Sequence, residues 1–301
     1  MRITDGNVEE TKSVNKRSAG EIAQGFFLLT HPGPVALHLL AVLVLALPAA
    51  WPHIVWATIL LLVAAHAAMQ LSIAMLNDYC DRHLDALSKP HKPIVRGWVK
   101  PREALGVGLF MIVLMVGLLL FLNPLALAIS LVYLVLGQAY NFGIKSTPWS
   151  GIVFALAIAL IPLYVLAGVG RTSPAIFWIV PVGFLIGVAL NLANSLSDIE
   201  SDQAGNAKTL AVILGVKGSF IACSLLILLA AALMGILSAL SVIPIIPWLT
   251  ALLLIIPFLA IGTMLLLFGP GKPAKTRRIY FYLVALTCII VGAVWFIIII
   301  S

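Results

Sequence analysis

Long apolar runs separated by short polar segments set the pattern of this chain. A helix that crosses a membrane needs about 20 predominantly apolar residues. The runs are continuously apolar, whereas strands of a membrane barrel alternate between apolar and polar positions, so helices are the predicted spanning elements. The sequence therefore predicts an all-α, polytopic membrane protein with nine spans at residues 34–50, 54–76, 103–122, 125–144, 150–168, 175–196, 218–240, 246–268 and 279–299.

The composition agrees with a chain that is surrounded mainly by lipid. Hydrophobic residues make up 62% of the 301 positions and charged residues 10%, whereas soluble domains carry about 25% charged residues. Residues 1–20 are polar, and the first apolar run begins too late for a cleaved secretory signal. We expect a polar N-terminal arm over residues 1–24 and one membrane domain over 25–301, built from halves at about 25–145 and 146–301.

A proline-rich motif, His31-Pro32-Gly33-Pro34, interrupts the helical pattern just before the first span. Proline removes a backbone donor and fixes φ. The motif therefore predicts a short surface helix that ends in a bend before the chain enters the membrane.

The distribution of charge predicts the orientation. If the N-terminus is cytoplasmic, 17 of the 18 Lys and Arg residues and all 11 acidic residues fall on the cytoplasmic side, with Arg171 as the exception. Cytoplasmic loops of membrane proteins carry such an excess of Lys and Arg. This bias, with attraction to anionic lipid, accounts for the net charge of +7, so nucleic acid is not a predicted partner. We expect a multi-pass protein of a prokaryotic cell membrane with its functional face toward the cytoplasm.

Five of the 11 acidic residues form two clusters, each at the end of a long apolar run: Asp78, Asp81 and Asp85, and then Asp198 and Asp202. At about 100° per residue, the three members of the first cluster fall within a helical sector of about 60°. Asn194 precedes the second cluster by four residues, and on a continuous helix the three side chains would sweep about 80°. Glu200 points away from this second stripe. Each cluster is thus predicted to form one polar stripe.

Grouped carboxylates at a membrane edge predict a bound cation. Converging carboxylates repel and raise one another's pKa unless a divalent ion neutralises them. Ligation by oxygen alone suits Mg²⁺, which shares its remaining positions with substrate phosphates. The alternative is a solvated helix end, because a single Asp at the edge of a span is inexpensive. The concentration of nearly half of the acids in two stripes favours the metal site.

Basic residues follow both clusters and predict an anionic ligand beside the metal. A proline-stiffened loop after the first cluster carries Lys89, Lys92 and Arg96, and Lys208 follows the second cluster. Tyr140 and Lys145 close the fourth span on the same side. Cations next to a metal site suit a metal–diphosphate complex, whose excess negative charge they balance. The alternative is that these residues only mark the cytoplasmic face.

Together these residues resemble the UbiA-type intramembrane prenyltransferase superfamily. The similarity extends over nearly the whole chain and rests on four motifs: Asn77-Asp78-x-x-Asp81-x-x-x-Asp85, Lys92-Pro93-Ile94-x-x-Gly97, Tyr140 with Lys145, and Asp198-x-x-x-Asp202 followed by Gly205-x-x-Lys208-Thr209. The resemblance implies a helical bundle around a central, lipid-open cavity. It also implies a fold similar to that of soluble isoprenyl diphosphate synthases.

The resemblance implies roles for individual residues. Catalytic roles are expected for Asp78, Asp81, Tyr140 and Lys145. Metal ligation by Asp78, Asp81, Asp85, Asp198 and Asp202 is expected. The diphosphate of an isoprenoid donor is expected to contact Asn77, Lys92, Arg96, Lys145, Asn194 and Lys208.

The implied reaction is Mg²⁺-dependent transfer of a polyprenyl group from an allylic isoprenyl diphosphate to a small-molecule acceptor within the membrane lipid. An aromatic or quinone precursor, or a related lipid precursor, is the expected acceptor, and the resemblance also allows chlorin or haem rings, glycerol phosphates and sugar phosphates. Lys92 stands where the family often has Arg, and residues 140–145 lack the proline-rich filling of several aromatic-acceptor members. No obligate protein partner is expected. The alternatives are a membrane terpene cyclase on the same fold and a transporter of divalent cations. Transport sites lie near the bilayer midplane, whereas both clusters lie at one membrane edge, which favours the enzyme.

Overall fold

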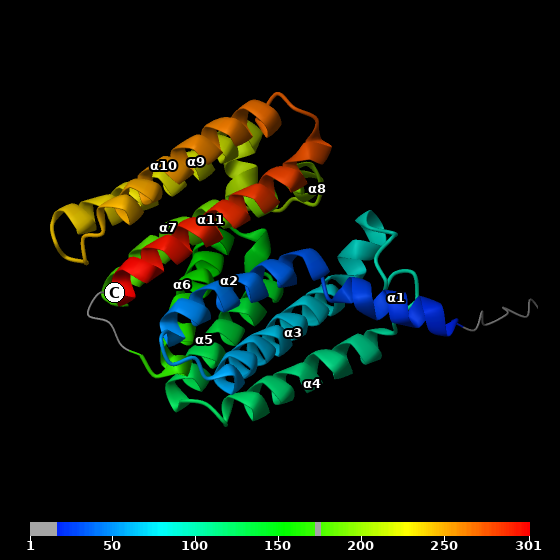
Figure 1. Cartoon of the computed structure of the whole chain (residues 1–301). Coiled ribbons are helices and arrows are strands. Elements are labelled where there is room, and N and C mark those ends of the chain that lie inside the picture. The colour runs from blue at the N-terminus through cyan, green and yellow to red at the C-terminus, as the bar shows by residue number, and fades with distance from the viewer. Residues whose placement is uncertain (1–16, 172–175) are drawn as a thin grey trace, which may run out of the picture.

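The computed structural model describes residues 17–171 and 176–301. Within these ranges the chain forms eleven α-helices, two 3-10 helices and no β-strand (Figure 1), which confirms the predicted all-α class. The elements in chain order are α1 (Ala19–Leu29), α2 (Pro32–Ala50), α3 (Trp56–Ser88), α4 (Pro101–Leu119), α5 (Pro124–Asn141), η1 (Ile144–Ser146), α6 (Ser150–Val169), α7 (Ile176–Ser195), α8 (Ile199–Ala204), α9 (Leu210–Ala239), α10 (Pro247–Phe268), η2 (Ala274–Thr276) and α11 (Arg277–Ile300).

Nine of the described helices are long and apolar enough to cross a membrane, as predicted: α2 to α7 and α9 to α11. The largest difference in length concerns α3. Its predicted span ends at residue 76, but the helix has 33 residues and continues to Ser88. Charged residues are compatible with a helix that leaves the membrane, so the end of an apolar run does not mark the end of a helix.

A central cavity of about 1170 Å³ lies within the bundle. Residues from α2, α3, α5, α6, α7 and α11 line its walls. The other three long helices lie outside this ring (Figure 1): α4 packs against α3, and α9 and α10 pack against α7 and α11. The predicted bundle around a central cavity is confirmed, with six helices forming the wall and three supporting it.

Helices α6 and α7 approach each other closely because small residues face one another. A Cβ atom added at Gly187 would lie 2.4 Å from the Cα atom of Ala155. One turn earlier on α7, a Cβ atom at Gly183 would lie 2.9 Å from the Cα atom of Ala159. Small residues four apart allow membrane helices to gain close van der Waals contact, which is the main attraction between helices in lipid. This contact fixes α7, which leads to the second acidic cluster.

A short helix precedes the first span, as the proline-rich motif predicts. Ser18 caps α1 by accepting a hydrogen bond from the backbone N–H of Glu21 at 3.1 Å. The helix then ends, and His31 adopts a left-handed backbone conformation with φ of 47° immediately before Pro32 starts α2. Arg17 forms an ion pair of 2.7 Å with Glu103 at the start of α4. The predicted arm over residues 1–24 therefore includes the beginning of α1, and its residues 1–16 lie outside the described ranges.

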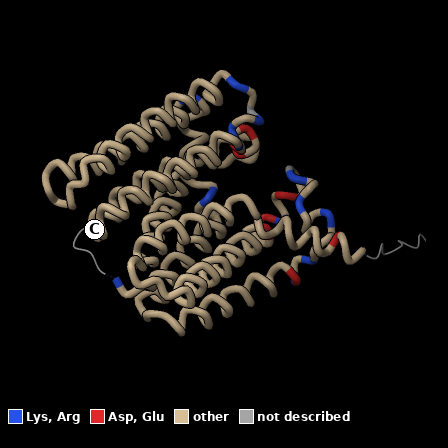
Figure 2. Tube along the Cα trace, viewed as in Figure 1, with Lys and Arg blue, Asp and Glu red and all other residues tan. Residues whose placement is uncertain are grey.

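The described charges gather at one end of the bundle (Figure 2), around α8, the end of α3 and the start of α11. Arg171 lies at the opposite end. Its guanidinium donates hydrogen bonds to the carbonyls of Ala49 at 3.1 Å, Trp51 at 3.3 Å and Ile300 at 3.3 Å. A cation that contacts the carbonyls at the ends of α2 and α11 is favourable, because those groups have no partner within their own helix. The one exception to the charge pattern thus has a structural role.

Candidate active site at the polar end of the cavity

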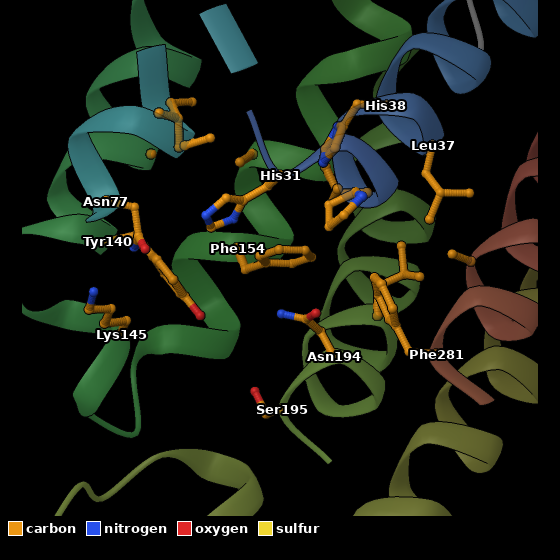
Figure 3. Close-up of a pocket in the computed structure, with 18 of the residues that line it drawn as sticks. His31, Leu37, His38, Asn77, Tyr140, Lys145, Phe154, Asn194, Ser195 and Phe281 are labelled. Carbon is orange, nitrogen blue, oxygen red and sulfur yellow. The ribbon is translucent and has the colours of Figure 1, made fainter. Parts of the chain in front are cut away.

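The charged end of the bundle is also one end of the cavity. Tyr140 and Lys145 lie on one side of it, and Asn194 and Phe281 face them across the space (Figure 3). Toward the other end the wall is mainly apolar, with Ile161, Ile179 and Val182 among the lining residues. The cavity therefore joins a wet, charged mouth to an apolar interior, a form that fits a molecule with an ionic head and a hydrocarbon tail.

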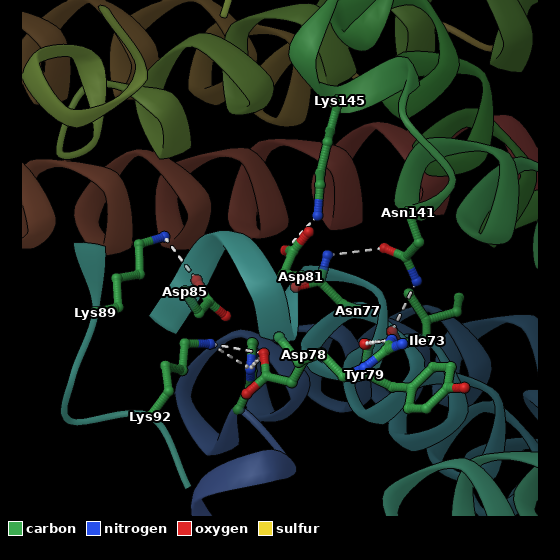
Figure 4. A network of polar contacts seen from close by, with 12 residues as sticks. Ile73, Asn77, Asp78, Tyr79, Asp81, Asp85, Lys89, Lys92, Asn141 and Lys145 are labelled. Atoms are coloured by element: carbon green, nitrogen blue, oxygen red, sulfur yellow. Dashed lines mark hydrogen bonds and ion pairs between the residues drawn. The ribbon is translucent and has the colours of Figure 1, made fainter. Parts of the chain in front are cut away.

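The first acidic cluster lies on an unbroken part of α3, so the predicted stripe exists. Asp81 and Asp85 line the cavity. The ammonium of Lys145, from η1, forms an ion pair with Asp81 (Figure 4). Lys89 lies 3.9 Å from Asp85, which is almost fully buried at 5% exposure. Both carboxylates thus face a lysine and the cavity.

Asp78 is held differently from the other two. Its Oδ1 atom lies 2.6 Å from the ammonium of Lys92 and 2.9 Å from Nε2 of His31. Its Oδ2 atom is buried with no hydrogen-bond partner among the residues that the structure describes. Within the same ranges Asp78 is not one of the cavity-lining residues. Asp78, a predicted metal ligand, is therefore turned toward the α1–α2 bend, and its Oδ2 atom has no hydrogen-bond partner among the described residues.

Asn77 contributes a side-chain amide between these carboxylates. Asn77 and Asn141 share a side-chain hydrogen bond of 2.9 Å, and Asn141 donates another of 2.9 Å to the Ile73 carbonyl (Figure 4). Both asparagines line the cavity. Because Asn141 ends α5, this pair joins the first cluster to the segment that carries Tyr140 and Lys145.

The second cluster does not lie on a continuous helix, which corrects the prediction. Helix α7 ends at Ser195, and Asp198 is the N-terminal cap of the separate helix α8. The regular spacing of Asn194, Asp198 and Asp202 therefore does not describe one helical stripe. All three residues nevertheless line the cavity. The break in the chain brings them there, and it could not be read from the spacing.

Glu200 points away from the site, as its position predicts. Its carboxylate accepts hydrogen bonds of 2.6 and 2.9 Å from the guanidinium of Arg277. The same guanidinium donates to the carbonyl of Leu196 at 3.2 Å. Arg277 is buried and starts α11. This contact holds the α7–α8 turn against α11.

The carboxylates of the site fit a divalent cation chemically but do not form a ready-made cage. Burial, and then the neighbouring Asp198, raise the pKa of the Asp202 carboxyl, an effect that a bound cation reverses. The free Oδ2 atom of Asp78 is a second oxygen in need of a partner. Among the described residues, however, no group of three His, Cys, Asp or Glu side chains is close enough to hold one metal ion. Lysines form ion pairs with the three carboxylates of the first cluster instead.

The predicted cations divide into two groups. Lys92 and Lys145 line the cavity. Arg96 and Lys208 are outside the set of described cavity-lining residues. The guanidinium of Arg96 lies 4.6 Å from the centre of the Trp98 ring, and Lys208 is exposed. The structure thus brings two of the four predicted cations to the site, with Lys89 and Arg278 in addition.

Among the polar residues at the site that the sequence analysis missed are His31 and Asn141. Their contact partners lie 47 and 64 residues away in the chain. The available signal was weak: each is a polar residue at the charged edge of an apolar span. Neither belongs to a spaced group, so nothing in the sequence distinguished them from residues of a solvated loop.

Known proteins similar to this chain agree with this arrangement. Residues 35–286 match the model of the UbiA prenyltransferase family. A digeranylgeranylglyceryl phosphate synthase of Methanoregula boonei is 30% identical over 197 residues, which are 64% of this chain and 70% of that protein. The protein of the same name from Pyrococcus abyssi is 34% identical over 143 residues, 47% of this chain and 51% of that protein.

The fold is also that of solved structures. A UbiA homolog from Archaeoglobus fulgidus bound to DMAPP and Mg²⁺ superposes with a TM-score of 0.70 over 91% of this chain and 99% of that protein, at 18% identity. This likeness concerns the arrangement of the helices. Taken with the family model, which covers most of the chain, it leads to one conclusion. The chain belongs to the UbiA prenyltransferase family.

Proposed function

We propose that the protein transfers a polyprenyl group from an allylic isoprenyl diphosphate to a lipid-soluble acceptor, with Mg²⁺ as cofactor and release of diphosphate. The observation that supports this most is the placement of four carboxylates, two from each acidic cluster, and three lysines at the charged mouth of one apolar cavity. A diphosphate with Mg²⁺ matches the mouth, and the hydrocarbon chain of the donor matches the interior. The Archaeoglobus fulgidus homolog of the same fold is bound to DMAPP and Mg²⁺.

In this proposal Asp81, Asp85, Asp198 and Asp202 hold the cation together with the free oxygen of Asp78. Bound Mg²⁺ supplies positive charge that makes diphosphate a better leaving group. Lys145 and Lys92 leave their aspartate partners in part to contact the diphosphate oxygens. Both lysines line the cavity.

The reaction breaks the bond between the allylic carbon and the diphosphate oxygen. The bonding electron pair leaves with the diphosphate, where Lys145 and Lys92 stabilise the growing negative charge. The allylic carbon becomes electron-poor and bonds to a nucleophilic atom of the acceptor, which then loses a proton. Tyr140, whose side chain lines this part of the cavity, presents an aromatic ring that stabilises the cationic carbon. The apolar wall keeps water away from that carbon.

Two classes of acceptor are proposed. The names of the curated relatives denote the synthesis of a glyceryl phosphate lipid, which supports a lipid of that class. The second class is an aromatic or quinone precursor, which the sequence favours among the acceptors that the family resemblance allows. The rings of His38 and Tyr133, which line the cavity, support this second class, because planar rings pack well against one another.

Several properties of the membrane setting belong to the same proposal. The excess of Lys and Arg at the charged end supports its location on the cytoplasmic side. A lateral opening to lipid would admit the donor chain. Two domain halves, over about 25–145 and 146–301, carry one acidic cluster each. Neither nucleic acid nor an obligate protein partner has a role in the proposed reaction.

The test is a transfer assay with purified protein in detergent. Labelled geranylgeranyl diphosphate and Mg²⁺ are supplied with a panel of glyceryl phosphate lipids and aromatic precursors, and the lipid products are extracted and identified. A labelled, prenylated acceptor supports the proposal and selects the acceptor class. A labelled hydrocarbon formed without any acceptor would instead support a terpene cyclase. The absence of any product would count against both.

A further inference from the structure

Four polar side chains gather inside the cavity, away from the charged mouth. His38 comes from α2, His66 and Gln70 from α3, and Tyr133 from α5. The amide nitrogen of Gln70 lies 2.9 Å from the Tyr133 hydroxyl, 3.2 Å from Nε2 of His66 and 3.4 Å from Nδ1 of His38. His38, Gln70 and Tyr133 line the cavity, and His38 appears at its wall in Figure 3. We call these four residues the inner polar cluster.

The cluster contains hydrogen-bond donors that its internal contacts do not use. The Gln70 nitrogen carries two hydrogens and lies within hydrogen-bond distance of three atoms, so at most two of these three contacts use its hydrogens at one time. In a neutral imidazole that accepts at one nitrogen, the other nitrogen carries a hydrogen. His66 is 2% exposed, and its Nδ1 atom has no hydrogen-bond partner among the described residues. The hydroxyl hydrogen of Tyr133 is a further donor.

Packing between helices does not account for these donors. The neighbouring Tyr164 shows how a buried hydroxyl is satisfied within the protein: it donates to the Leu62 carbonyl at 2.7 Å. Three residues of the inner polar cluster, His38, Gln70 and Tyr133, instead line the open cavity. A buried polar group without a partner is costly in an apolar environment. A donor polyprenyl chain is pure hydrocarbon and cannot relieve that cost.

We infer that the inner polar cluster is a binding subsite for a neutral oxygen atom of an otherwise apolar, ring-shaped acceptor, a carbonyl or hydroxyl oxygen of an aromatic or quinone-like molecule. The cluster offers hydrogen-bond donors and no fixed charge, which suits a neutral oxygen better than a phosphate. The ring centres of His66 and Tyr133 are 5.6 Å apart at an interplanar angle of 74°, and those of His38 and His66 are 5.8 Å apart. Such rings provide flat surfaces for another ring.

The position of the subsite agrees with a role in orienting the acceptor. Gln70 precedes Asn77 by seven residues on the continuous helix α3, so the cluster lies roughly 10 Å below the level of the charged mouth. This interval can contain the allylic carbon of the donor and one aromatic ring. An acceptor oxygen held at the cluster would direct the opposite edge of the ring toward that carbon. Only this orientation of the acceptor toward the allylic carbon rests on the proposed function; binding of a neutral oxygen at the cluster does not.

The test compares two ligands of the same shape and needs neither donor nor Mg²⁺. Duroquinone is a fully methylated benzoquinone, and durene is the hydrocarbon with the same ring and no oxygen. Their binding to the purified full chain in detergent is measured by equilibrium dialysis and corrected for partition into empty micelles. Tyr133→Phe removes only a hydroxyl from the cluster. Tyr164→Phe is the matched control, because its hydroxyl bonds to backbone and does not line the cavity.

We expect the parent protein to bind duroquinone more tightly than durene. The ratio of the two affinities should fall about fivefold in Tyr133→Phe, the effect of one hydrogen bond to a neutral group, and stay unchanged in Tyr164→Phe. His38→Phe should lower the ratio similarly and serves as the second variant if Tyr133→Phe does not fold. An equal affinity for the two ligands in the parent, or a ratio that neither cluster variant lowers, would overturn the inference.

Release of diphosphate from geranylgeranyl diphosphate, measured on the same preparations, separates this inference from the proposed function. If diphosphate is released but Tyr133→Phe does not change the affinity ratio, prenyl transfer is supported and the subsite is contradicted. If Tyr133→Phe changes the ratio but no diphosphate is released, the subsite is supported and prenyl transfer is contradicted.

Discussion

Nε2 of His31 lies 2.9 Å from Oδ1 of Asp78, across 47 residues of sequence. His31 is the left-handed residue at the α1–α2 bend, and Asp78 is the first carboxylate of the aspartate motif on α3. The contact therefore ties the start of the first span to the candidate metal site. Because His31 and Lys92 both occupy Oδ1, the buried Oδ2 atom is the oxygen left for a cation.

This contact predicts a role for His31 in orienting Asp78. His31→Ala should raise the Mg²⁺ concentration for half-maximal diphosphate release by about tenfold, as expected when the residue that orients a metal ligand is lost. His31→Gln should restore most of the parent value, because an amide can still bond to the carboxylate. The measurement is a Mg²⁺ titration of release at saturating donor. A half-maximal concentration that is the same in His31→Ala and the parent would contradict the orienting role.

Lys145 is predicted to bind the diphosphate of the donor. Lys145→Ala should weaken donor affinity by roughly tenfold, because a charge-assisted hydrogen bond to an anion contributes about 1.5–3 kcal/mol. Expression and thermal stability should change little, since Lys145 belongs to the short η1 segment at the wet end. Binding of a non-hydrolysable donor analogue measures the effect. Lys272→Ala, at an exposed loop lysine, is the control, and an equal loss in both variants would indicate a general charge effect only.

The pair of Glu200 and Arg277 is predicted to stabilise the α8–α11 contact in a pH-dependent way. The hydrogen bonds from Arg277 hold the pKa of the Glu200 carboxyl below its ordinary value of 4.5. A lowered pKa in the folded state means that the stabilisation is present above about pH 4.5 and is lost as the pH falls through the folded-state value. Glu200→Gln should therefore lower the melting temperature at neutral pH by roughly 1–3 °C. The difference should disappear in acid, and a difference that grew there would contradict the assignment.

The close approach of α6 and α7 predicts a cost for any side chain at Gly187. Gly187→Ala places a Cβ atom 2.4 Å from the backbone of Ala155, where no flexible side chain can move away. The resulting overpacking should destabilise the protein by about 1–3 kcal/mol. Gly117→Ala in α4 is the matched control, because nothing lies within 4 Å of its added Cβ atom. Thermal unfolding in detergent compares the two, and an equal melting temperature for both variants would argue against the contact.

The sequence predicted the helices and the first acidic cluster well, for a physical reason. Apolar runs of sufficient length have few alternatives to a spanning helix, and a helix fixes the relative directions of residues three and four apart. Asp81 and Asp85 therefore share the cavity wall, as their spacing requires. For the second cluster, the residues that line the cavity were predicted, but the continuous helix expected to carry them was wrong. The end of α7 at Ser195 leaves no strong signal in the sequence.

Contacts between distant segments were the part that the sequence could not provide. The burial of Asp78 under His31 and Lys92 depends on how α1, α2 and α3 pack. The position of Arg96 over Trp98 likewise follows from the fold of the loop. Spacing along one helix describes neither case, so the sequence did not indicate which cations line the cavity.

Measuring diphosphate release most directly tests the proposed metal–diphosphate site. The parent protein, Asp198→Ala and Glu200→Gln are incubated in detergent with geranylgeranyl diphosphate, with and without Mg²⁺. Both acids lie at or beside α8, but only Asp198 lines the cavity. We expect the parent and Glu200→Gln to release diphosphate in a Mg²⁺-dependent way. A folded Asp198→Ala protein should not release diphosphate. Release that is independent of Mg²⁺, or that persists in Asp198→Ala, would contradict the proposed metal–diphosphate site.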